Sequence, residues 1–182
     1  SSANAALVYP VTAVGSSSYP TYNDFFAIDT NAYTDWASFH QGAGSTLKLD
    51  LGAVYSIQTA YITDRVTSGG ANGAFVGGLY DFTLSYTIQA YQDALFTLPV
   101  GAGVTNTPAI PGSVSGPNSF LTTASLSGVP ARYVLYTVNS VNHALGTYDN
   151  PGLSDIHFNV SAVPEPSTWA MMILGFFGVG FV

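Results

Sequence analysis

LYDFTLSYTIQAY, residues 79–91, alternates apolar with polar side chains through Phe82, Leu84, Tyr86 and Ile88. A period of two residues points alternate side chains to opposite faces of a β-strand, so one face of this segment can be buried. The segment is also rich in aromatic and β-branched residues, which strands favour. It therefore predicts a strand long enough to lie in the middle of a sheet.

The same signature recurs on both sides of this segment. Apolar and polar residues alternate in STLKLD at 45–50, and β-branched and aromatic residues fill SIQTAYITDRV at 56–66. Towards the C-terminus, the same strand pattern occurs in ARYVLYTVNSV at 131–141 and in LSDIHFNV at 153–160. No stretch before Val163 has the period of an amphipathic helix. The segments therefore predict several strands joined by turns.

Residues 99–118, PVGAGVTNTPAIPGSVSGPN, are rich in Pro and Gly and have no sustained apolar period. This composition predicts a long surface connection between strands. The chain contains no internal repeat, and 182 residues suit one all-β domain plus a tail. The sequence thus predicts an all-β fold, an antiparallel jelly-roll β-sandwich over residues 1–162.

The composition excludes several classes of partner and chemistry. Only 7% of residues are charged, the net charge is −7, and the permanent cations are Lys48, Arg65 and Arg132 alone. Such a chain cannot neutralise a row of phosphates, so nucleic acid is excluded as a partner. The chain contains no cysteine, which excludes disulfides and thiolate chemistry. Ala3-Asn4-Ala5 has the small-x-small form of a signal-peptidase site, which suggests export.

The C-terminal segment 163–182 has a different character. Pro164 and Pro166 cannot donate to a β-ladder, so the sandwich is expected to end before them. From Trp169 to Val182 no charge interrupts the apolar run, although a full bilayer crossing needs about 20 residues. This segment predicts a short apolar membrane helix.

The segment resembles the PEP-CTERM sorting signal of exopolysaccharide-producing Gram-negative bacteria, with Pro164, Glu165 and Pro166 as the sorting motif. In that family an Arg-rich cluster follows the helix, and none follows here. The resemblance implies an exported protein on the periplasmic or cell-surface side, anchored to the membrane by its C-terminal helix. Whether an exosortase cuts this tail is left open.

Four motifs occur in the order seen in discoidin-type domains, the galactose-binding-like jelly rolls that include coagulation-factor domains and carbohydrate-binding modules. They are AIDTNAYTDWAS at 27–38, LKLDLG at 47–52, ARYV at 131–134 and GLSDIHF at 152–158. The chain is similar to this family over residues 27–158. The resemblance implies a jelly roll whose first loop meets the last strand.

In that family the first loop and the last strand often hold a structural Ca²⁺. The resemblance places the metal ligands at Asp29, Thr34 and Asp155. Carboxylate and hydroxyl oxygens suit Ca²⁺, which takes six to eight oxygen ligands in proteins. Thr30 replaces the usual Gly and Asp155 replaces a longer Glu, so the reach of Asp155 across the site is the open point.

Loop residues supply the candidates for ligand binding. Phe39, His40 and Tyr148 lie in expected loops and could form a ligand rim, and Arg65 could clamp a carboxylate or a sugar hydroxyl. The alternative for each scarce arginine is an ion pair with a nearby Asp, and Arg132 is expected to be structural. Trp36 is either a sugar platform or a core residue, and the family resemblance favours the core.

No catalytic residues are predicted. The histidines do not have metal-ligand spacing, and the sequence contains neither a Gly-x-Ser-x-Gly motif nor a phosphate loop. The leading hypothesis is a non-catalytic module that binds glycan, including exopolysaccharide. The second is an accessory structural subunit of a larger membrane protein complex, with the tail helix docked among other membrane-protein subunits. A polysaccharide-degrading enzyme would need a carboxylate pair that the sequence does not indicate.

Overall fold

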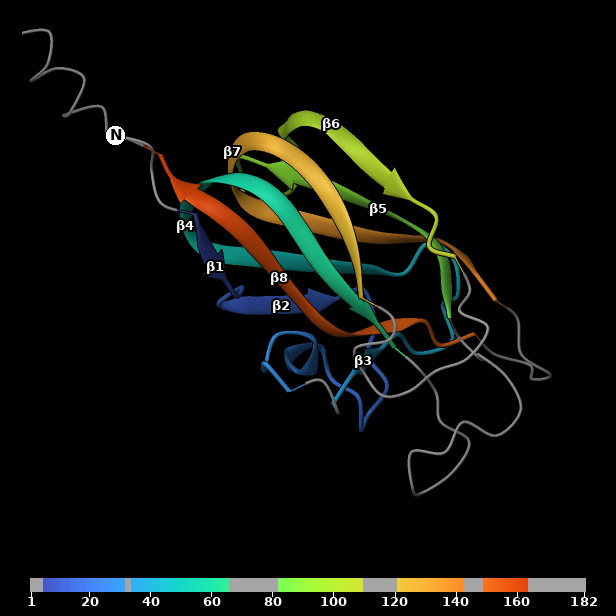
Figure 1. Cartoon of the computed structure of the whole chain (residues 1–182). Helices are drawn as coiled ribbons and strands as arrows, with labels where there is room; N and C mark the ends of the chain where they lie inside the picture. Colours follow the sequence, from blue (N-terminus) through green and yellow to red (C-terminus); the bar gives the residue numbers. More distant parts are fainter. Residues whose placement is uncertain (1–4, 32–33, 66–81, 110–120, 143–148, 164–182) are drawn as a thin grey trace, which may run out of the picture.

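The computed structural model describes residues 5–31, 34–65, 82–109, 121–142 and 149–163 (Figure 1). Eight strands and one short 3₁₀ helix, η1, make up this part of the chain. In chain order they are β1 (Ala6–Val8), β2 (Thr12–Gly15), η1 (Asp24–Ala27), β3 (Trp36–Ala37), β4 (Thr46–Asp64), β5 (Thr83–Tyr91), β6 (Pro99–Asn106), β7 (Leu121–Val141) and β8 (Gly152–Ala162).

All named strand pairs are antiparallel, in the order β1-β8-β4-β7-β5-β6, with β2 added beside β4 and β3 beside β8. Strands β4 and β7 are the longest, and Figure 1 shows both curving strongly along their length. Residues 46–50 of β4 pair with residues 133–137 of β7 and with β2. Residues 55–64 of β4 pair with β8 and with residues 121–131 of β7. Each long strand therefore contributes to both layers of a folded-over sheet.

The change of layer occurs at an irregular stretch of β4. The pairing register with β7 shifts between Asp50 and Tyr55, and Gly52 has a φ of +81° that side-chain-bearing residues rarely adopt. The Asp50 carboxylate accepts a hydrogen bond from the Gly52 amide at 2.7 Å. It also forms a bidentate ion pair with Arg132 of β7, at 2.8 and 2.9 Å. The expectation that Arg132 is structural is confirmed.

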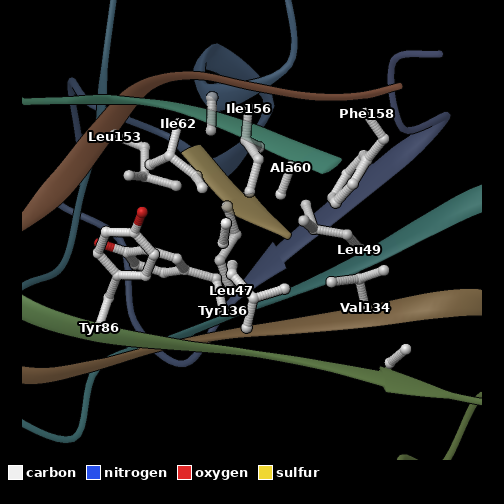
Figure 2. Packing of buried hydrophobic residues seen from close by; sticks show 14 of the residues in the cluster. Leu47, Leu49, Ala60, Ile62, Tyr86, Val134, Tyr136, Leu153, Ile156 and Phe158 are labelled. Carbon is white, nitrogen blue, oxygen red and sulfur yellow. The ribbon is translucent and has the colours of Figure 1, made fainter. Parts of the chain in front are cut away.

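The core lies between the two layers (Figure 2). Leu47 and Leu49 point inward from one part of β4, and Ile62 points inward from the other; each is at most 1% exposed. Phe158 on β8 faces the same core. The alternation that predicted these strands is thus the alternation between core and solvent, and the predicted antiparallel β-sandwich is confirmed.

Trp36 is fully buried, which confirms its expected place in the core. Its indole Nε1–H donates to the Ser17 carbonyl at 3.1 Å and to the Ser18 hydroxyl at 3.2 Å. A buried indole needs such a polar partner. Trp36 therefore ties the segment after β2 to the sandwich and is not available as a sugar platform.

Several boundaries differ from the sequence-based prediction. Strand β7 begins at Leu121, before the predicted segment 131–141. Residues 46–50 and 56–64, which belong to two segments predicted as separate strands, lie on the single strand β4 (Thr46–Asp64). The predicted surface connection at 99–118 begins with strand β6 (Pro99–Asn106), so this prediction was wrong for its first part. Strand β6 pairs only with β5 at the edge of the sheet and buries no residue fully, and it therefore lacks the apolar alternation of inner strands.

The predicted membrane helix, with Pro164, Glu165 and Pro166 before it, lies outside the described residues. Within the residues that are described, no helix is long and apolar enough to cross a bilayer.

Gly152 is the first residue of β8 and pairs with Ala37 of β3. A substitution at Gly152 therefore tests the pairing of these two strands. A Cβ atom at residue 152 would collide with the carbonyl oxygen of Trp36, which is backbone and cannot swing away. We expect Gly152→Ala to lower the free energy of unfolding by about 1–3 kcal/mol, measured by urea denaturation. Gly103→Ala is the control, because its nearest neighbour at 2.9 Å is the flexible end of Gln89. Equal stability of the two variants would contradict the β3–β8 contact.

Candidate functional site

Four aromatic side chains gather on the surface beside β3, and we call them the aromatic cluster: Tyr19, Tyr22, Phe39 and His40. The rings of Phe39 and His40 are stacked, with centroids 4.0 Å apart and an angle of 19° between their planes. The Tyr19 ring lies 5.4 Å from Phe39 and 5.9 Å from Tyr22. The cluster joins the loop after β3 to the segment that precedes η1.

The cluster is open to solvent. Phe39 is 45% exposed and Tyr22 is 37% exposed, although large aromatic side chains are mostly buried in folded proteins. An exposed aromatic group of this kind offers apolar faces together with the polar ends of Tyr and His, which is the combination that binding sites use. The structure therefore confirms that Phe39 and His40 lie together on the surface.

Backbone hydrogen bonds fix the loop that carries Phe39 and His40. The Phe39 amide donates to the Ser17 hydroxyl at 2.9 Å, and the His40 amide donates to the side-chain oxygen of Asn150 at 3.0 Å. His40 has a φ of +55°, in the left-handed region that non-glycine residues rarely occupy. Such strain persists where the surroundings hold the backbone in place, and it concentrates at functional sites.

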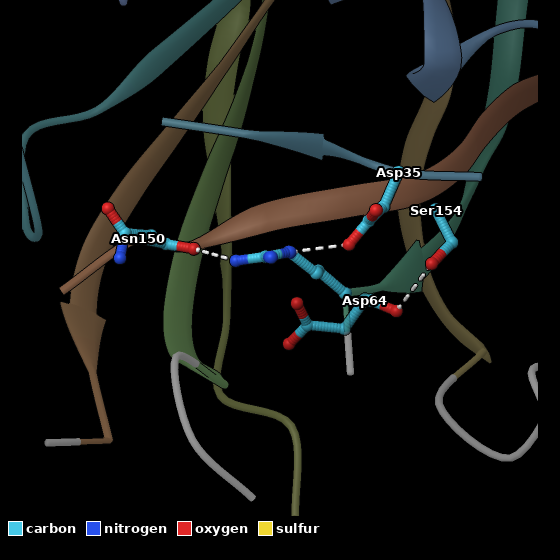
Figure 3. A network of polar contacts seen from close by, with 5 residues as sticks. Asp35, Asp64, Asn150 and Ser154 are labelled. Carbon is cyan, nitrogen blue, oxygen red and sulfur yellow. Dashed lines mark hydrogen bonds and ion pairs between the residues drawn. The ribbon is translucent and has the colours of Figure 1, made fainter. Parts of the chain in front are cut away.

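Arg65 lies beneath the aromatic cluster and is only 6% exposed. Its guanidinium forms an ion pair with Asp35 and donates to the Asn150 carbonyl at 2.8 Å (Figure 3), and it lies 4.7 Å from the centre of the Tyr22 ring. Burial raises the pKa of the Asp35 carboxyl, while Arg65 acts in the opposite direction. Arg65 was a candidate ligand clamp. The structure corrects this, because the guanidinium binds protein groups and supports the cluster from below.

Asp64, the residue before Arg65, is buried at the same end of the sandwich. Its Oδ2 accepts a hydrogen bond from the Thr83 amide at 2.9 Å, and its backbone carbonyl accepts one from the Ser154 hydroxyl at 3.3 Å (Figure 3). Its Oδ1 is buried without a hydrogen-bond partner. Burial raises the pKa of this carboxyl well above its usual range.

The structure brings two of the three expected metal ligands together. The Thr34 hydroxyl donates to Asp29 Oδ2 at 2.7 Å. Asp155 lies on β8, with Oδ2 2.6 Å from His157 Nδ1 and with Oδ1 buried and unpartnered. A buried carboxylate oxygen without a partner is chemically suited to accept a cation, since burial without a partner is costly. The described residues contain no group of three or more His, Cys, Asp or Glu side chains that could hold a metal.

Sequence reasoning found part of this site. Tyr148 lies outside the described residues. Tyr19, Tyr22 and Asn150 were missed, because Tyr19 meets Phe39, Tyr22 meets Arg65 and Asn150 meets His40 only where the fold joins segments that are far apart in the sequence. The only local signal was a pair of tyrosines around Pro20 in the turn-rich segment SSSYPTYN at 16–23.

Comparison with family models found no match, and comparison with curated protein sequences also found none. Several solved structures share the fold. A family 32 carbohydrate-binding module from Clostridium perfringens NanJ, in complex with galactose, is 17% identical, with 85% of this chain and 99% of that chain covered and a TM-score of 0.55. The family 32 module CBM32-3 from a family 31 glycoside hydrolase of Clostridium perfringens is 14% identical, with 85% of this chain and 91% of that chain covered and a TM-score of 0.61.

A chitosan-binding module from a chitosanase/glucanase of Paenibacillus sp. IK-5 is 19% identical, with 83% of this chain and 95% of that chain covered and a TM-score of 0.58. At these identities the likeness establishes the fold. The family 32 modules have a discoidin-like jelly-roll fold, so this part of the prediction is confirmed.

Asp64 makes the stability of the fold depend on pH. Because its pKa is raised on folding, it stabilises the folded state below its unfolded pKa near 3.8, and this contribution is lost as pH rises through the folded pKa. We expect the stability of Asp64→Asn relative to the unmodified protein to increase as pH rises from 4 to 8, measured by urea denaturation at each pH. Parallel profiles for the unmodified protein and Asp64→Asn would contradict the assignment.

Proposed function

We propose that the chain is a non-catalytic glycan-binding module and that the aromatic cluster is its ligand site. The observation that carries this proposal is the open, ordered stack of Phe39 and His40 beside Tyr19 and Tyr22. The C–H faces of a sugar ring can pack on exposed aromatic rings, while its hydroxyls need polar partners at the rim.

The cluster offers both kinds of contact. Phe39 supplies an exposed apolar ring, and the hydroxyls of Tyr19 and Tyr22 and the imidazole of His40 supply polar atoms around it. The loop is held by Ser17 and Asn150 before a ligand arrives, which reduces the entropy lost on binding. This arrangement can bind a sugar without any catalytic group.

The solved structures with the same fold support this class of function. They include a module in complex with galactose and a module described as chitosan-binding. Some of these modules come from enzyme chains, as in the family 31 glycoside hydrolase. The proposed ligand is therefore a glycan, with galactose-containing and amino-sugar glycans as the first to test.

Phe39→Ala tests the aromatic cluster directly. We expect at least a tenfold loss of affinity for the best ligand from a panel of galactose-containing and chito-oligosaccharide glycans, measured by isothermal titration calorimetry. A tenfold loss corresponds to about 1.4 kcal/mol. Phe25→Ala is the matched control, because Phe25 is 59% exposed on η1 and belongs to no ring contact of the cluster. Unchanged affinity in Phe39→Ala, or no binding across the panel, would refute the proposal.

We also propose that the module acts outside the cytoplasm and is held at a membrane. The support is the sequence alone: the sorting motif at Pro164, Glu165 and Pro166 and the apolar run from Trp169 to Val182. The competing proposal, an accessory subunit of a membrane complex, rests on the same tail. Co-purification of stoichiometric partners in mild detergent favours the subunit, and glycan binding by the free protein favours the module.

A structural Ca²⁺ held by Asp29, Thr34 and Asp155 is proposed as the stabiliser of the loop before β3. The bound ion would link this loop to β8 and supply charge for the unpartnered Asp155 Oδ1. We expect CaCl₂ at about 100 times the dissociation constant to stabilise the fold by about 2.7 kcal/mol, which is a rise in Tm of about 5–10 °C.

The rise should disappear with chelator and in Asp29→Asn, and persist in Asp24→Asn, measured by differential scanning fluorimetry. A Tm that calcium does not move in the unmodified protein would exclude the site.

A further inference from the structure

An open groove of about 230 Å³ lies on the outer face of the layer that contains β2 and the first part of β4. Leu47 and Leu49 point into the core, so the residue between them, Lys48, points outward with Asp50. Asp50 pairs with Thr12 of β2 on one side and with Tyr133 of β7 on the other. The lining residues are Thr12, Val14, Lys48, Leu49, Asp50, Ala94, Phe96 and Tyr133.

One wall of the groove is a turn held in a fixed shape. The Asp93 carboxylate accepts hydrogen bonds from the Leu98 amide at 2.7 Å and from the Thr97 hydroxyl at 2.9 Å. Phe96 has a φ of +58°, in the left-handed region that a side chain of this size rarely adopts. Its ring meets Tyr133 edge-on, with centroids 6.0 Å apart. The turn therefore presents Phe96 over the sheet in advance of any ligand.

Lys48 is the cation of this groove and the only lysine of the chain. Its ammonium lies 5.2 Å from the centre of the Phe96 ring, which orients it by a cation–π interaction. Among the described residues no carboxylate pairs with it, whereas Arg65 is paired with Asp35 and Arg132 with Asp50. In a chain of net charge −7, the ammonium of the single lysine thus lies in an aromatic groove.

We propose that this groove is a second saccharide site, which binds one uronic acid unit of an anionic polysaccharide. The ammonium of Lys48 would receive the carboxylate, and the faces of Phe96 and Tyr133 would receive the ring. Thr12 and Asp50 offer oxygen atoms for ring hydroxyls. That the ligand is a saccharide rests on the proposed function, whereas its negative charge rests on Lys48.

The size and openness of the groove favour a single ring within a longer chain. Its volume is below the roughly 300 Å³ at which sites for drug-sized ligands begin. The aromatic cluster beside β3 differs from the groove in charge. The cation beneath the cluster, Arg65, is paired with Asp35, so its charge is balanced by a protein carboxylate. The two sites therefore select different sugars, neutral at the cluster and acidic at the groove.

A single lysine makes the test direct. Reductive ¹³C-methylation keeps the positive charge and labels only Lys48 and the N-terminal amine. We expect a β-1,4-linked mannuronic acid tetrasaccharide to shift the Lys48 methyl signal saturably. Mannotetraose, which lacks the carboxylates, should not. Absence of a saturable shift with the acidic tetrasaccharide overturns the proposal. An equal shift with sodium acetate also overturns it, because the groove would then bind carboxylates in general.

Variants separate this proposal from the proposed function. Lys48→Gln and Phe96→Ala should each weaken calorimetric binding of the mannuronic tetrasaccharide at least tenfold, and Lys48→Arg, which keeps the charge, should retain most of it. Phe39→Ala should leave this binding unchanged. Unchanged affinity in Lys48→Gln overturns the second site while the aromatic cluster stands. Binding that depends on Lys48, in a protein that binds no neutral glycan, supports the groove and refutes the cluster.

Discussion

The sandwich depends on two strands, β4 and β7, that belong to both of its layers. Where β4 changes layer, Gly52 takes a left-handed conformation, and Arg132 of β7 donates two hydrogen bonds to the Asp50 carboxylate. These hydrogen bonds lower the pKa of the Asp50 carboxyl and so keep it ionised. The pair is partly exposed, so its main effect is geometric: it fixes where both strands bend. The inward leucines of β4 then face Ile62 and Phe158.

This bend also places the two candidate sites. The buried end of β4 brings Asp64 and Arg65 under the loops beside β3, where the Arg65–Asp35 pair supports the aromatic cluster. The other part of β4 turns Lys48 outward beneath the turn that carries Phe96. A buried ion pair adds little net stability over an apolar replacement, but removing one partner leaves a costly unpaired charge. Removing either Arg65 or Asp35 would therefore leave an unpaired charge beneath the cluster.

Local periodicity was enough to predict strands on β4, β5, β7 and β8, because alternation reports directly which face meets the core. The buried position of Trp36 was predicted from the family resemblance. Periodicity failed for β6, an edge strand with both faces largely exposed, and it split β4 in two at the bend. Phe39 and His40 were identifiable as neighbours in a loop. Their partners Tyr19 and Tyr22 were not, since only the fold brings these segments together. The burial of Arg65 likewise depends on Asp35 and Asn150, which no sequence spacing indicates.

The placement of the three cations has a consequence for protease resistance. Lys48 and Arg132 lie within paired strands, and Arg65 directly follows β4. A trypsin-like enzyme must hold several residues of its substrate in an extended, unpaired form. Local opening of the sheet at its central strands costs close to the full free energy of unfolding. While folded, the protein thus protects the bonds after Lys48 and Arg132 from such enzymes, and the rate of cutting at these two sites reports global unfolding.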